Sequence, residues 1–211
     1  MTVEPHGARP MPLRPLEVAW RVLAACALLL AVSHAWGQAL IECLLPLFRL
    51  EIGWLEDRYR ILGLSLAVQG ADSVIRLDVS LQRIMVVGDH VVYPDPRGLA
   101  HVTTLTGHVL QPAILGLGLL TAWPPLAPAP LAREYALRLL LGLAMLGVVL
   151  ALDVPFVLLG ELWAIAHQRF APGSFSPLLL WVDFLQGGGR LALGLLAGAA
   201  GIAAAGTMVR A

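Results

Sequence analysis

The residues of this chain that could do chemistry are ionisable side chains that lie within or beside long apolar segments. An ionisable group in such a segment is costly to bury, and it commonly marks a partner, an ion path or a substrate site. Five of these residues are charged and three are histidines: Glu42, Asp153, Glu161, Asp183, Arg190, His34, His108 and His167. We take this set as the candidate polar site of the molecule.

Asp153 is the sharpest case, because it stands in the middle of the apolar run 148–155 with no offsetting charge nearby on its own helix. Pro155 removes one backbone donor from the same stretch. The nearest plausible cation is Arg190, which follows three glycines at 187–189. Three interpretations stay open: an ion pair between Asp153 and Arg190, a protonated Asp153 bonded to a carbonyl near the proline, and a proton- or substrate-handling role.

The three histidines come from three different apolar segments, so a metal or haem site would need them at one depth on facing helices. None of them has a second ligand three or four residues away, as a strong ligand motif would. Cys26 and Cys43 show no metal-binding spacing either. The spacing favours histidines that are hydrogen-bonded near an interface, and no cofactor is predicted.

Motifs of known catalytic sites are missing from the sequence. There is no Ser-x-x-Lys, no His-Glu-x-x-His and no Gly-x-Ser-x-Gly, and the glycines at 187–189 lack the pattern of a phosphate-binding loop. The net charge is zero and no basic patch suggests a nucleic-acid partner. No catalytic residue is therefore predicted.

Composition predicts the class of protein that must position these residues. The chain is 58% hydrophobic and 13% charged, with a mean hydropathy of +0.79, which is typical of a multi-span membrane protein. Segments of about twenty apolar residues can cross a bilayer. Four such segments are predicted, at residues 18–40, 109–127, 139–166 and 191–209. Gly194 and Gly198 in the last one would let another helix approach closely, from within the protein or from a partner.

A polar segment at 49–105 separates the first two apolar segments. Residues 73–82 alternate between apolar and polar side chains, which is typical of a half-buried strand. With candidate strands at 61–68, 74–81, 84–87 and 91–93, the segment predicts a small antiparallel β-meander, and 51–59 is expected to lie along the membrane surface. The apolar face of the meander should rest on the helices or on another protein.

The predicted fold is therefore mainly α and integral to the membrane, with four transmembrane helices and the β-meander between the first two. Its regions are a disordered tail, the first helix with an extension, the β-rich segment and a three-helix region, at 1–17, 18–48, 49–105 and 106–211. Arginines flanking the apolar segments predict that both termini are cytoplasmic and that the β-rich segment is outside. Residues 178–186 are expected to form an interfacial half-helix that turns at 187–189.

The order of these parts resembles the small membrane proteins that accompany bacterial exosortases. The resemblance is carried by Gly-His-Val-Leu-Gln-Pro at 107–112, Leu-Ala-Arg-Glu at 131–134 and the Gly-Gly-Arg that opens the fourth segment. It implies a non-catalytic accessory or assembly subunit of an envelope protein-sorting or export system, in a bacterial inner membrane and docked on a membrane partner. The alternatives are a redox or metal-binding subunit using the histidines, and a proton-coupled transport subunit using Asp153 and Arg190.

Overall fold

The computed structural model describes residues 15–95, 97–126 and 131–210. Five α-helices, five strands and one π-helical turn follow one another along the described part of the chain. Their order is α1 (Pro15–Leu55), β1 (Tyr59–Gln69), β2 (Asp72–Leu81), β3 (Met85–Val87), β4 (His90–Val92), β5 (Ala100–Leu105), α2 (Thr106–Ala122), α3 (Leu131–Phe170), α4 (Pro177–Phe184), the π-helical turn (Leu185–Gly189) and α5 (Arg190–Arg210).

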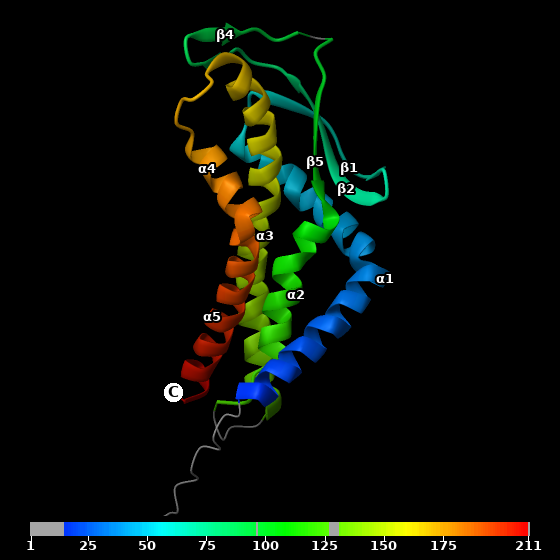
Figure 1. The fold of residues 1–211 in the computed structure, drawn as a ribbon, viewed down its shortest axis with the longest axis vertical. Helices are drawn as coiled ribbons and strands as arrows, with labels where there is room; N and C mark the ends of the chain where they lie inside the picture. Colours follow the sequence, from blue (N-terminus) through cyan, green and yellow to red (C-terminus); the bar gives the residue numbers. More distant parts are fainter. Residues whose placement is uncertain (1–14, 96, 127–130, 211) are drawn as a thin grey trace, which may run out of the picture.

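The molecule is an elongated helical bundle with a small sheet at one end (Figure 1). Helices α2, α3 and α5 lie side by side along the long axis, α1 leans against them, and the C-terminus lies at the end opposite the sheet. Within the described residues, three helical stretches are long and apolar enough to cross a membrane: Pro15–Leu55, Leu131–Phe170 and Pro177–Val209. Together with the shorter apolar α2, they confirm the prediction of a mainly helical chain with a small antiparallel sheet.

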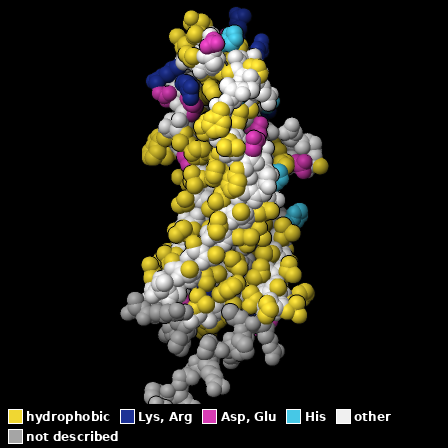
Figure 2. All heavy atoms as spheres, turned by 60° about the vertical axis from the view of Figure 1, so that its left-hand side comes forward, with side chains coloured by type: hydrophobic (Ala, Val, Ile, Leu, Met, Phe, Trp, Pro, Cys, Tyr) yellow, Lys and Arg dark blue, Asp and Glu magenta, His cyan; other side chains and the backbone are white. Residues whose placement is uncertain are grey.

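The surface has two regions of different chemistry. Figure 2 shows hydrophobic side chains covering most of the bundle, whereas basic and acidic side chains gather at the end that carries the sheet. Large apolar side chains on the outside of α1 illustrate this pattern: Trp20 is 71% exposed and Leu28 is 67% exposed. An apolar surface of this extent is far larger than water-soluble proteins normally leave uncovered.

The helix boundaries differ from the predicted ones at proline-rich and charged positions. Helix α2 ends at Ala122 rather than near 127, because Pro124 and Pro125 cannot continue a helix. Residues 15–17 of the predicted tail are helical and belong to α1, and the remainder of that tail, 1–14, lies outside the described residues. Helix α1 also continues to Leu55, so the first half of the predicted surface segment belongs to it.

The sheet contains a strand that the sequence does not signal. Strands β1, β2 and β5 form one antiparallel sheet in that order, and β3 and β4 form a separate hairpin. The expected simple meander is thus replaced by a three-stranded sheet closed by β5. Strand β5 runs directly into α2 without turn residues between them, so its alternation merges with the apolar segment that follows.

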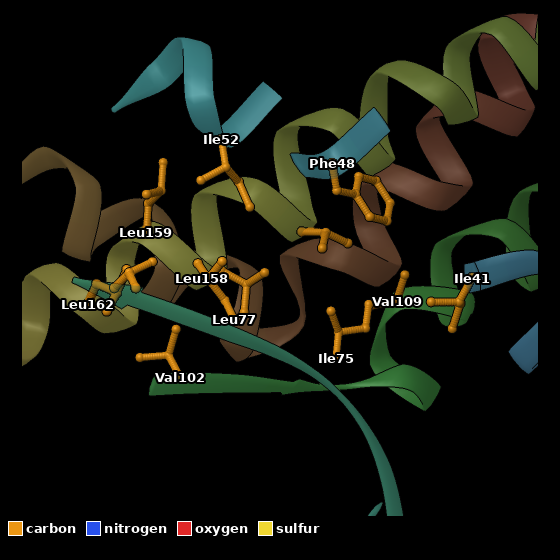
Figure 3. Close-up of a cluster of buried hydrophobic side chains, with 12 residues drawn as sticks. Ile41, Phe48, Ile52, Ile75, Leu77, Val102, Val109, Leu158, Leu159 and Leu162 are labelled. Atoms are coloured by element: carbon orange, nitrogen blue, oxygen red, sulfur yellow. The ribbon is translucent and has the colours of Figure 1, made fainter. Parts of the chain in front are cut away.

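The apolar face of the sheet packs on the helices, as expected (Figure 3). Ile75, Leu77 and Val79 of β2 are fully buried, against Ile41, Phe48 and Ile52 of α1 and Val154 and Leu158 of α3. Burial of one such side chain contributes about 1.5–3 kcal/mol. The sheet is therefore fixed to the upper parts of α1 and α3 by a continuous core, where "upper" means toward the sheet end.

Candidate functional site

Asp153 and Arg190 form a buried ion pair between α3 and the first residue of α5. Arg190 Nε donates to both carboxylate oxygens of Asp153, at 2.8 Å to Oδ1 and 3.0 Å to Oδ2. The Asp153 side chain is 1% exposed and the Arg190 side chain 5%. The sequence leaves three interpretations of Asp153 open, and the structure shows the first of them, the ion pair with Arg190.

A tight turn brings Arg190 to this position. Helix α4 corresponds to the predicted half-helix, and the π-helical turn that follows contains the predicted glycine hinge. Gly188 has a φ of 108°, which L-residues rarely adopt, and a Cβ at Gly189 would lie 2.5 Å from the Phe184 carbonyl oxygen. Trp181 Nε1 also donates to the Leu152 carbonyl oxygen at 3.0 Å and ties α4 to α3 beside Asp153.

The backbone of Gly188 supplies a prediction of its own. Gly188→Ala should lower the free energy of unfolding by about 1–3 kcal/mol, because alanine must adopt a positive φ there. Gly187→Ala is the matched control, since its added Cβ would meet open space and no positive φ is required. Urea or detergent unfolding of the two variants should separate them; equal effects would contradict the role of the turn.

Of the remaining polar candidates, only His108 lies close enough to Asp153 for an electrostatic interaction among the contacts of the described residues. Glu161 accepts a hydrogen bond from Gln186 Nε2 at 2.9 Å, and His167 Nε2 lies 2.8 Å from Ser174 Oγ. The other four, Glu42, Asp183, His34 and His108, are exposed on their helices. Among the described residues no three His, Cys, Asp or Glu side chains lie close enough to hold a metal ion. The three histidines are thus not brought together.

Gly194 and Gly198 contact α2 inside the bundle. A Cβ on Gly194 would lie 2.5 Å from the Pro112 carbonyl oxygen, and one on Gly198 would lie 2.9 Å from the Gly116 carbonyl oxygen. Both glycines are buried. The sequence left open whether these glycines pack within the protein or against a partner, and in the structure they pack α5 closely against α2.

A second buried charged pair lies at the opposite end of α3. Glu134 and Arg138 form an ion pair and both side chains are 0% exposed. Arg138 donates to the carbonyl oxygens of Trp123 at 2.7 Å and Pro124 at 2.8 Å, and Glu134 accepts from the Leu126 N–H at 2.8 Å. From the sequence, Arg138 indicates only the cytoplasmic side. The spacing of four between an acid and a base was the available signal for a pair.

The structure also contains a pocket of about 450 Å³ that the sequence does not reveal; we call it the upper pocket. It lies between the end of α1, the start of β1, the β3–β4 turn, α3 and the α3–α4 connection. One stripe of α3 lines it, with side chains three or four residues apart: Phe156, Leu159, Trp163 and His167. Leu55, Tyr59, Ser174, Ser176 and Leu178 contribute further walls.

The polar groups of the upper pocket hold one another in place. Arg58 Nε donates to Glu56 Oε1 at 2.6 Å, and the Arg58 guanidinium lies 6.0 Å from the centre of the Trp163 ring. Trp163 Nε1 donates to Ser176 Oγ at 3.0 Å. The hydrogen bond to Glu56 raises the pKa of Arg58, and burial raises the pKa of the Tyr59 phenol. The pocket therefore brings together a guanidinium held by a carboxylate and the hydroxyl and indole groups around them.

Comparison of the chain with protein-family models, with curated proteins and with solved structures finds no match. The functional conclusion therefore depends on the arrangement described above.

Proposed function

We propose that this chain is an integral protein of a bacterial inner membrane that acts as a non-catalytic accessory or assembly subunit and docks on a membrane partner. Its membrane part is supported by the spacing of charges along the helices. Between Arg138 and Glu161, α3 carries Asp153 as its only charged residue, and Arg190 neutralises that charge. These 22 residues rise by about 33 Å, close to the hydrocarbon thickness of about 30 Å.

The apolar stretches of α1 and α5 fit the same hydrocarbon thickness. Residues 22–41 of α1 and 191–209 of α5 contain no Asp, Glu, Lys or Arg. Trp20 and Tyr135 lie in the first two turns of α1 and α3, which begin at the end opposite the sheet (Figure 1), and aromatic residues favour a membrane interface. In this arrangement both termini are cytoplasmic and the sheet lies on the outer side.

The observation that carries the accessory role is an exposed apolar surface at the sheet end of the molecule, beyond the proposed hydrocarbon layer. The hairpin and its flanks, which we call the hairpin surface, expose large apolar side chains at the sheet end: Ile84, Val86, Val91, Tyr93 and Leu99. Tyr93 is 69% exposed and Leu99 72%. Lipid would not cover these residues at the far end of the molecule, so a surface of this kind supports contact with the outer part of a membrane partner.

The transport alternative is less well supported by the geometry. A proton-coupled role requires Asp153 to exchange protons with water, yet its carboxylate is 1% exposed and accepts two hydrogen bonds from Arg190. The redox alternative requires converging ligands, and the described histidines do not converge. The geometry therefore supports neither a transport function nor a redox function over the accessory role.

The test is capture of the partner from the native membrane. Alkaline carbonate extraction should first leave the chain in the membrane pellet, and gentle solubilisation of a tagged chain should then co-purify a stoichiometric membrane protein. Val86→Glu with Val91→Glu should abolish that co-purification, because both side chains are exposed in the hairpin surface. Val68→Glu, at a 77% exposed position on β1, is the matched control and should retain the partner. Loss of the partner from the Val68→Glu control, with the partner retained in the Val86→Glu and Val91→Glu variant, would contradict a role of the hairpin surface.

A further inference from the structure

The upper pocket combines an apolar floor with a polar rim. The floor consists of Phe156, Leu159 and Leu178, and the rim of Glu56 and Arg58 with Ser174 and Ser176. A pocket of about 450 Å³ is within the range of small-molecule sites. An apolar floor beneath a polar rim suits an amphiphile, because its hydrocarbon chain needs apolar surroundings and its headgroup needs polar ones.

The charges in the rim favour a ligand that carries both signs. Glu56 and Arg58 stand side by side, with Arg58 Nε donating to the carboxylate, so the pair as a whole is neutral. No described residue bonds Arg58 Nη1, which leaves donors for an anionic oxygen. A purely anionic ligand could use only Arg58, whereas a zwitterion can place its phosphate on Arg58 and its ammonium on Glu56.

The depth of the pocket favours a membrane lipid as the source. This step depends on the membrane arrangement proposed above. If the hydrocarbon core begins at Arg138, about 30 Å along α3 brings its outer surface near Leu158. Phe156 and Leu159 then lie at that surface, and Trp163, under Arg58, lies about one turn above it, in the headgroup region.

We infer that the upper pocket binds the headgroup of a zwitterionic phospholipid with a primary ammonium, such as phosphatidylethanolamine. Arg58 binds the phosphate, Glu56 accepts from the ammonium, and Phe156, Leu159 and Leu178 contact the first part of the chains. The Ser176 hydroxyl, fixed by its bond from Trp163, offers one further donor to a phosphate oxygen.

The test measures binding of short-chain lipids to the purified full chain in a neutral detergent by native mass spectrometry. Short-chain phosphatidylethanolamine should bind more tightly than short-chain phosphatidylglycerol or phosphatidylcholine. Arg58→Gln and Glu56→Gln should each weaken that binding roughly ten-fold, the loss of one charge-assisted hydrogen bond. Arg76→Gln should leave it unchanged, because Arg76 and Asp78 form a similar pair two residues apart on the sheet, outside the upper pocket.

Three results would overturn the inference. These are equal binding of phosphatidylglycerol, unchanged binding in both Arg58→Gln and Glu56→Gln, and equally tight binding of chain-free phosphoethanolamine, which would make the ligand a soluble one. Thermal unfolding without lipid checks that each variant folds. The assay needs no bilayer, so its failure is distinct from a failure of carbonate extraction, which tests membrane insertion.

Discussion

Asp153→Ala is expected to lower the free energy of unfolding by about 3–5 kcal/mol. The substitution leaves the Arg190 guanidinium buried without its carboxylate, and breaking a buried pair from one side costs more than the pair itself contributes. Because Arg190 opens α5, the packing of α5 on α3 should loosen at its upper end. The measurement is unfolding in mild detergent, followed by circular dichroism and by tryptophan fluorescence.

A double variant separates a structural pair from a transport site. Asp153→Leu with Arg190→Met removes both charges and should recover most of the lost stability, since replacing a buried pair by apolar side chains is often neutral or favourable. Co-purification of the partner should recover with it. A stable double variant that still captures the partner but has lost a proton-coupled transport activity in cells would instead favour the proton-coupled alternative for Asp153 and Arg190.

Gly194→Ala is the second substitution with a large expected effect, a loss of about 1–3 kcal/mol or more. Its Cβ would lie 2.5 Å from the Pro112 carbonyl oxygen and 2.6 Å from Pro112 Cα, and backbone atoms cannot move aside as a flexible side chain can. Helices α2 and α5 would have to separate. Unfolding in mild detergent measures the loss.

The matched control is Gly147→Ala on α3, where the added Cβ would meet nothing within 4 Å. There the exchange should be neutral or slightly stabilising, because alanine favours a helix more than glycine does. The same chemical change is thus expected to have opposite signs at two helical glycines. A stabilising Gly194→Ala would show that α2 and α5 do not pack as closely as the structure has them.

Much of the fold was predictable because it depends on local patterns. The alternation along β2 indicated a strand with one buried face, and the lengths of the apolar runs indicated the helices. The position of β5 was not predictable, because no turn residues separate it from α2. The extension of α1 to Leu55 was missed for a related reason: its charged residues, such as Glu51, resemble an interface segment, while Phe48 and Ile52 are buried by distant parts of the chain.

The candidate site was predictable only in part. Asp153 and Arg190 could be named from the sequence because each is conspicuous in an apolar context, but their pairing depends on the turn at Gly188. The upper pocket could not be found in this way. Its walls come from four separate stretches, and in the sequence Glu56 and Arg58 look like any other charged residues of an exposed segment.

The shared core of the sheet and the helices has a consequence for the order of assembly during synthesis. Strands β1 and β2 emerge long before α3, which supplies Val154 and Leu158 to cover Ile75 and Leu77. Until α3 is made, only α1, through Ile41, Phe48 and Ile52, can cover the apolar face of the sheet, so the part of that face that packs on α3 stays open. Under the topology proposed above, periplasmic chaperones would meet the chain during this interval, and α3, rather than the strands themselves, would complete the folding of the sheet end.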